Sequence, residues 1–278
     1  MSAGPFSLRR VGLIAQNTLL EAVRQRLVNV LVFLALALVL GARAFRDFNF
    51  GAPELKFLAD CGFGAMAFFG SALTIATAAQ LFFSEIENRT ALTLLARPVW
   101  RAEFVIGKWL GVATLAALFC AVLTGLLIAV LWTRERELML EFPESFGGVH
   151  AVSYATVATA GLLQALKLAV LAAGTIFVAS FAQTQLFTVG AGFFILVICH
   201  LQYLAQDAYA RSAVPVAKVA GALIGAAFPN FQLFAVADTL VAAEGPTALQ
   251  VAGIAAYAGG YVVLAGGLAI VAFRHREI

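Results

Sequence analysis

The sequence predicts an all-α, polytopic membrane protein with six transmembrane helices in one domain, residues 1–278. Hydrophobic residues make up 62% of the chain and charged residues 12%, whereas soluble proteins carry roughly a quarter charged residues. The mean hydropathy is +0.94. The apolar residues also occur in long runs, and a run of about 20 residues lets a helix cross a bilayer. We therefore exclude a soluble domain and expect contact with lipid and none with nucleic acid.

The N-terminal residues 1–26 carry four arginines and lack a small-residue cleavage site, so we expect the first apolar run to be retained. This stretch also has helical periodicity. Its apolar stripe consists of Leu8, Val11, Ala15, Leu19 and Ala22. We expect an amphipathic helix in the membrane interface, with its basic residues near anionic headgroups. A cytoplasmic tail that only sets topology is the alternative.

Six apolar runs are long enough to span the membrane. They cover residues 27–42, 57–83, 104–132, 151–181, 186–205 and 249–273. A further apolar stretch at 213–228 is short and contains Pro215 and Lys218. We expect it to form re-entrant or external helices before the sixth span, not a seventh span.

The distribution of basic residues supports six spans. With that number, both termini and residues 84–103 share one side, which holds ten lysines and arginines against seven on the other. A seventh span would move Arg274 and Arg276 to the opposite side. Because basic residues near span ends favour the cytoplasm, we expect cytoplasmic termini in the inner (plasma) membrane. The outer segments 43–56 and 133–150 are then expected to be loops, the second of them acid-rich.

A charged segment separates the second and third apolar runs. Residues 85–108 hold four basic and three acidic side chains. Residues 90–95 can form a short helix, which Pro98 ends because its ring removes an amide donor and restricts the preceding residue. Arginines in this segment can pair with carboxylates of a partner, and its leucines offer an apolar anchor. A solvated loop that only enforces topology is the alternative.

The segment contains a spaced pattern of charged, apolar, proline and glycine residues: Glu85, Arg89, Thr90, Leu94, Leu95, Pro98, Val99, Arg101, Glu103, Gly107 and Lys108. This pattern resembles the signature of ABC type-2 transporter permeases. In that family the corresponding segment is a coupling helix that contacts a cytoplasmic ATPase subunit. The resemblance therefore implies a coupling helix at 84–103. The implied ATPase-coupling residues are Glu85, Glu87, Arg89, Thr90, Leu94, Leu95, Arg97, Pro98, Arg101, Glu103, Gly107 and Lys108.

A second block resembles the permease branch associated with copper-enzyme maturation. It consists of Cys199, His200, Leu201, Pro229, Asn230, Phe231, Phe234 and Asp238. Members of that branch often have a Gly-His pair where this chain has Cys199-His200. The resemblance to permeases extends over the whole chain in span order.

The sequence contains no phosphate-binding loop. Ala102 and Trp109 stand where that motif needs a glycine and a Ser or Thr around Gly107-Lys108. We therefore expect no enzymatic activity and no cofactor in this chain, with ATP and magnesium held by a partner ATPase subunit. The three cysteines have no metal-like spacing, and His150 and His275 are isolated, so we expect no metal site.

Lys167 lies near the middle of the fourth apolar run, with Gln164 one turn before it. A lysine inside the membrane is costly and usually faces a partner or a wet cavity. They are candidates for a polar lining of a translocation path. A structural role, with Lys167 bound to backbone carbonyls or reaching the interface, is the alternative.

Taken together, the resemblance implies the permease subunit of an ATP-driven ABC type-2 exporter, which forms the translocation path and couples to a separate ATPase. The implied partners are that ATPase, a second permease copy (identical or a paralogue) and a periplasmic accessory protein. Two alternatives stay open. One is a membrane subunit that transmits force without translocating a substrate. The other is a secondary transporter, which predicts inverted repeats that the sequence does not display.

Overall fold

The computed structural model describes residues 6–44, 54–87, 100–141, 152–210, 215–235 and 245–274. Within these ranges the chain forms eight α-helices and short 3-10 turns, with no strand. The elements are α1 (Leu8–Val23), α2 (Arg26–Gly41), α3 (Glu54–Glu87), α5 (Arg101–Glu141), α7 (Tyr154–Phe181), α8 (Gln185–Ala210), α9 (Pro215–Ala227), η2 (Phe231–Phe234) and α10 (Ala248–Arg274). The all-α prediction is confirmed.

Six helices are long and apolar enough to cross a membrane: α2, α3, α5, α7, α8 and α10. Their cores coincide with the six predicted apolar runs. The fourth begins at Tyr154 and not at 151, because Ser153 caps it: its side chain accepts a hydrogen bond from the Thr156 amide. The predicted short helix at 213–228 is present as α9.

The third span is longer than its apolar run. The apolar run predicts an end at 132 and a loop at 133–150, but α5 continues to Glu141. This part of the prediction was wrong. Residues 133–141 are rich in Arg, Glu, Leu and Met, which favour helix, and Arg134 pairs with Glu137 one turn later at 2.8 Å. At 1.5 Å per residue α5 is about 60 Å long.

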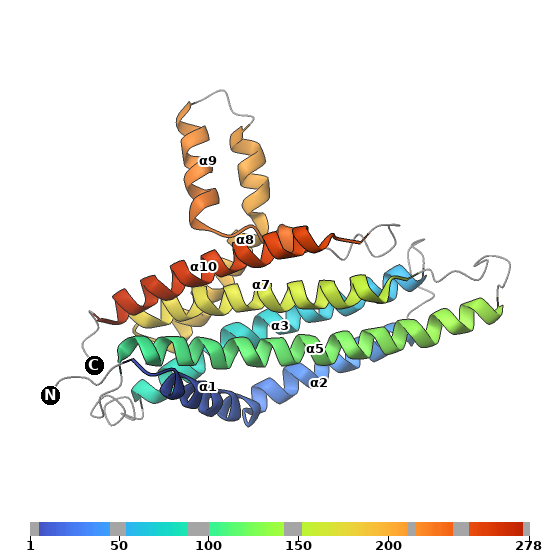
Figure 1. The fold of residues 1–278 in the computed structure, drawn as a ribbon, viewed down its shortest axis with the longest axis horizontal. Helices are drawn as coiled ribbons and strands as arrows, with labels where there is room; N and C mark the ends of the chain where they lie inside the picture. Colours follow the sequence, from blue (N-terminus) through green and yellow to red (C-terminus); the bar gives the residue numbers. More distant parts are fainter. Residues whose placement is uncertain are drawn as a thin grey trace.

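The helices pack around α3 and α7. Figure 1 shows α3, α5, α7 and α10 running side by side along the long axis, with α1 alongside one end of α5. In α3 and α7, 67% of the apolar stretch that could cross the membrane is buried inside the bundle. The buried share is 22% in α2 and α8 and 11% in α10. The core therefore lies between α3, α5 and α7, and the outer helices leave large apolar faces for lipid or another subunit.

The end of α5 that carries Glu141 is fixed by ion pairs among three helices. Arg134 donates to both carboxylate oxygens of Glu54 on α3, at 2.6 and 3.0 Å. Glu137, on α5, also pairs with Arg43, which follows α2. Glu135 is 1% exposed and accepts hydrogen bonds from residues at the start of α7. The acidic residues expected in a loop therefore serve as helix-to-helix contacts.

α9 and the end of α8 form a hairpin that stands away from the bundle in Figure 1. Gly221 of α9 lies so close to Tyr209 of α8 that an added Cβ would sit 2.5 Å from the Tyr209 Cβ. α10 holds the base of this hairpin. The Tyr261 hydroxyl donates to the Gly225 carbonyl at 3.1 Å, and the Tyr257 hydroxyl accepts from the Asn230 amide at 2.8 Å.

Candidate functional site

The candidate site lies where α3 ends and α5 begins, on either side of the predicted coupling helix. Most of that helix lies outside the described residues. This applies to Arg89, Thr90, Leu94, Leu95, Arg97 and Pro98, and to the side chains of Glu85 and Glu87. The structure describes the side chains of Arg101, Glu103 and Lys108 and the backbone of Gly107, which together form the base of the segment.

Glu103 binds four donors. Its Oε1 accepts hydrogen bonds from the Ser7 amide and from Arg10 Nη2, both at 2.7 Å. Its Oε2 accepts from Arg10 Nε at 2.9 Å and from the Trp100 amide at 3.2 Å. The side chain of Glu103 is fully buried. Hydrogen bonding to Glu103 raises the pKa of Arg10 above its ordinary value, as expected for a bidentate pair with a carboxylate.

The position of Glu103 explains this pattern. It is the third residue of α5, from which a Glu side chain can reach back to the amide of the N-cap residue, here Trp100. Ser7 is the N-cap of α1. One carboxylate thus binds at the start of two helices, where backbone amides and the helix dipole both favour a negative charge.

α1 also contacts α5 at two glycines one turn apart, Gly107 and Gly111. A Cβ on Gly107 would lie 2.7 Å from the Ile14 side chain and 3.2 Å from the Val11 carbonyl oxygen. A Cβ on Gly111 would lie 2.6 Å from Thr18 and 2.9 Å from the Ala15 carbonyl oxygen. Only glycine allows the two helix backbones to approach this closely.

The predicted apolar stripe of α1 is confirmed in part. Val11 and Ala22 are buried, and the Ala15 carbonyl faces Gly111. Thr18 belongs to the same face, whereas Leu8 is exposed. The stripe therefore faces α5, and the location of α1 in the membrane interface stays a prediction.

Arg101 joins the start of α5 to the end of α10. Its Nη1 donates to the carbonyls of Phe273 and Arg274, at 3.0 and 2.5 Å, and its guanidinium lies 5.9 Å from the Phe273 ring centroid. A cation at these C-terminal carbonyls is favourable because they carry the negative end of the helix dipole.

An aromatic cluster packs between α3, α5 and α10 next to this junction. Phe82 of α3 contacts Phe104 of α5 and Phe273 of α10, with ring centroids 5.7 and 5.5 Å apart. Lys108 is 1% exposed, and its Nζ lies 5.8 Å from the Phe104 ring centroid. The ends of α3 and α10 and the start of α5 are therefore packed into one unit.

Of the predicted coupling residues that are described, Glu103, Gly107 and Lys108 lie inside this junction, covered by α1 or by the aromatic cluster. They hold the base of the coupling segment in place and offer no open surface. Their part in ATPase coupling stays a prediction. Sequence reasoning missed Ser7, Arg10 and Gly111, although the four-residue spacing of Gly107 and Gly111 was a signal for close helix packing.

Comparison with known families identifies the protein family. A family model described as ABC-2 family transporter protein matches residues 13–277. The chain belongs to the ABC-2 transporter family. A comparison with curated proteins found no match. ABC-2 chains are multi-pass membrane permease subunits that generally carry out no catalysis, and the family implies partnership with an ATPase subunit.

In this ABC-2 chain the two predicted interior polar residues lie on the same buried part of α7. Gln164 is 7% exposed and Lys167 is 5% exposed. The Gln164 amide nitrogen has no hydrogen-bond partner within the described part of the chain. The two residues are brought together inside the bundle, and their part in a translocation path stays a prediction.

The second block of the ABC-2 chain forms a packing unit beside α10. The rings of His200 and Phe231 meet edge to face with centroids 5.5 Å apart. The Asn230 side chain caps η2 by accepting from the Gln232 amide at 2.9 Å. Asp238 lies outside the described residues. Within the described ranges no group of three or more His, Cys, Asp and Glu side chains could hold a metal ion.

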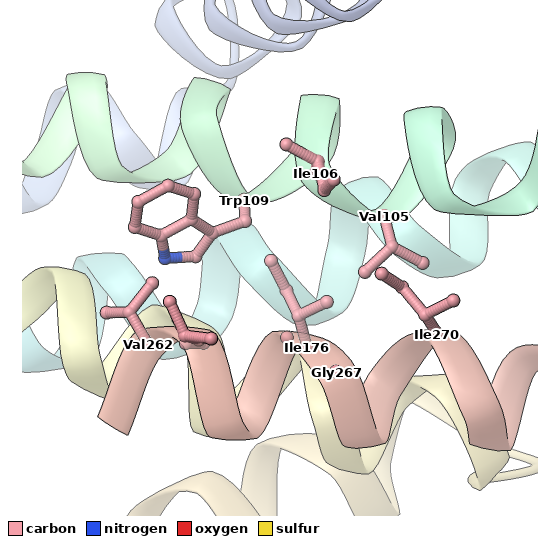
Figure 2. Close-up of a pocket in the computed structure, with 10 residues that line it drawn as sticks. Val105, Ile106, Trp109, Ile176, Val262, Gly267 and Ile270 are labelled. Atoms are coloured by element: carbon pink, nitrogen blue, oxygen red, sulfur yellow. The ribbon is translucent and has the colours of Figure 1, made fainter. Parts of the chain in front are cut away.

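Two apolar cavities lie between α5, α7 and α10, with volumes of about 370 and 410 Å³. Trp109 lines both. Its indole N–H donates to the Ala169 carbonyl at 3.0 Å. In Figure 2 the side chains of Val105 and Trp109 on α5 and of Val262 and Ile270 on α10 point toward the first cavity from opposite sides.

Proposed function

We propose that this ABC-2 chain is the permease subunit of an ATP-driven exporter and that it works with a second permease copy and ATPase subunits. The ATPase subunits would bind ATP and magnesium. The proposal places both termini and residues 84–103 in the cytoplasm of a cell with an inner (plasma) membrane. In this account the coupling segment docks on the ATPase, and α1, α5 and α10 receive its movement.

The observation that carries the proposal is the binding of Glu103 at the starts of both α1 and α5. Trp100 lies within the predicted coupling segment 84–103 and is its first described residue after Pro98, and its amide donates to Glu103. Arg10 ties the same carboxylate to α1. The next residue, Arg101, binds the end of α10. A displacement of the coupling segment would therefore be transmitted to three helices, α1, α5 and α10.

Co-purification tests this proposal. The affinity-tagged chain is expressed with its candidate ATPase, and the double variant Glu85→Arg with Arg97→Glu is compared with wild type. We expect wild type to retain the ATPase and the double variant to lose most of it. Arg136→Glu is the matched control, because Arg136 is exposed near the other end of α5. Equal retention by all three proteins, or no retention by wild type, would reject the coupling segment as the docking site.

The length of α5 favours one further candidate, a subunit that transmits force to a periplasmic accessory protein. α5 is about 60 Å long, whereas a bilayer with its headgroups is about 40–45 Å thick. Its far end is fixed to α3 by Arg134, to α7 by Glu135 and to Arg43, which follows α2, by Glu137. Capture of a periplasmic protein that is lost when Leu140 and Glu141 are both changed to serine would support this candidate.

Membership of the copper-enzyme maturation branch stays part of the proposal only. The contact of His200 with Phe231 supports a structural role for the residues that carry that resemblance. A secondary transporter is disfavoured by the family membership, which links the chain to ATP-driven transport.

A further inference from the structure

We propose that the groove between α5, α7 and α10 binds one acyl chain of an anionic membrane phospholipid, with the headgroup at Arg101 and Arg274. The groove consists of the two cavities that Trp109 and Val262 both line, about 370 and 410 Å³ in volume. This inference does not depend on ATPase coupling, because lipid binding can be measured on the purified chain.

The lining of the groove suits a hydrocarbon chain. Around the first cavity it is entirely apolar or glycine, with Val105, Ile176 and Ile270 among its members. The Trp109 N–H is already bonded to Ala169. Around the second cavity the hydroxyl of Thr114 donates to its own helix at 2.7 Å. A polar solute would find no group to replace its water, whereas an acyl chain needs none.

The mouth of the groove carries positive charge. Val105 and Ile270 line the first cavity, and Arg101 and Arg274 lie one helical turn beyond them, on the same helix faces. The hydrogen bonds of Arg101 to the end of α10 hold its guanidinium there. The nearby carboxylate of Glu103 does not cancel this charge at the mouth, because it is buried against Arg10 and α1. Guanidinium groups beside an apolar groove are complementary to a lipid phosphate.

Charge also favours a lipid over a second copy of the chain. Two copies in one membrane have the same orientation, so a symmetric interface across this groove would bring both pairs of Arg101 and Arg274 to the same depth. Those like charges would repel each other. Because an acyl chain only exchanges one apolar surrounding for another, the headgroup is expected to set the selectivity.

Glycines on α10 allow a sharp test. A Cβ added at Gly266, Gly267 or Gly253 would meet no atom within 4 Å. Gly266 and Gly267 line the groove, and Gly253 lines neither cavity. Gly267→Leu should therefore fill the groove without disturbing the packing, and Gly253→Leu is its control on the same helix. Gly266→Leu serves if Gly267→Leu does not fold.

The experiment measures lipids retained by the purified full-length chain, using native mass spectrometry after exchange into equal amounts of palmitoyl-oleoyl phosphatidylglycerol and phosphatidylcholine. We expect wild type and Gly253→Leu to retain phosphatidylglycerol preferentially and Gly267→Leu to lose it. Arg274→Gln should reduce the preference about fivefold, the effect of one basic residue at a membrane surface. A phosphatidylglycerol with a photoreactive tail should label α5 and α10 peptides around the groove.

Three results would overturn the proposal. Equal retention of the two lipids by wild type would exclude a headgroup site. Equal lipid retention by Gly267→Leu and Gly253→Leu would place the lipid elsewhere. Loss of a dimer in Gly267→Leu, without loss of lipid, would show that a second copy covers the groove.

Discussion

Arg10 of α1 binds both carboxylate oxygens of Glu103 on α5, from Nε at 2.9 Å and from Nη2 at 2.7 Å. The same carboxylate accepts the amides of Ser7 and Trp100. The pair thus connects the first helix of the chain to Trp100, in the last part of the predicted coupling segment. Through these contacts, a movement of the coupling segment would be transmitted to α1 and α5.

Glu103→Gln should loosen α1. Glutamine keeps one acceptor oxygen but loses the charge and cannot receive both donors of Arg10 as a carboxylate does. We expect a loss on the order of 1.5–3 kcal/mol in the free energy of unfolding, as for hydrogen bonds to charged groups, and faster proteolysis within α1. Thermal unfolding in detergent and limited proteolysis measure these effects. Glu141→Gln, at the exposed end of α5, is the control, and an equal effect of both changes would contradict this account.

Gly111→Leu should separate α1 from α5 without unfolding the spans. A Cβ at Gly111 already overlaps Thr18 and the Ala15 carbonyl oxygen, so a larger side chain forces the helices apart. Spin labels on α1 and α5 should move apart by electron-spin resonance. Gly125→Leu is the matched control, because a Cβ there meets no atom within 4 Å. An unchanged distance in Gly111→Leu would rule out the close approach of α1.

Arg134→Met should destabilise the end of the bundle that carries Glu141, opposite to the end that carries Glu103. Arg134 is 6% exposed and pairs with Glu54 and Glu137. Its removal takes the cation from Glu54, whereas Glu137 keeps Arg43. We expect a loss of about 2 kcal/mol, below the value for fully buried pairs, because Glu137 keeps that partner and is partly exposed. Arg136→Met removes an exposed arginine from the same helix and should be near neutral. Comparable melting temperatures for the two variants would contradict the assignment of Arg134 as the ion-pair centre.

Lys167→Met should leave the chain at least as stable as wild type. Lys167 is buried within α7, where a charged side chain is costly and a methionine of similar shape is not. The measurement is the melting temperature in lipid nanodiscs, with Lys56→Met as the control at the start of α3. A fall of several degrees in Lys167→Met alone would show that its charge supports the structure.

The six spans could be predicted because each contains an apolar run whose length matches the bilayer. The end of α5 could not, because Arg134, Glu135 and Glu137 look solvent-exposed until their partners on α2, α3 and α7 are known. Local sequence gives their helix propensity but not their ion pairs, which come from residues far away in the chain.

Only part of the candidate site could be predicted from the sequence, for the same reason. The charged segment and its position between two spans could be recognised from the sequence. The burial of Glu103 could not, because it depends on Arg10 and Ser7, more than 90 residues earlier in the chain. A charged residue beside a predicted docking helix suggests contact with a partner, and only the position of α1 shows that this residue faces inward.

The most direct test of the central claim is the ATP-dependent movement of the assembled transporter in nanodiscs, followed by spin-label distances between positions 140 on α5 and 249 on α10. Leu140 and Leu249 are both exposed, so labels there should not disturb packing. We predict that ATP changes this distance in wild type and in Glu141→Gln. In Glu103→Gln the ATPase should stay bound while the distance no longer responds to ATP. A full ATP-dependent change in Glu103→Gln would contradict the claim that Glu103 and Arg10 connect the coupling segment to the spans.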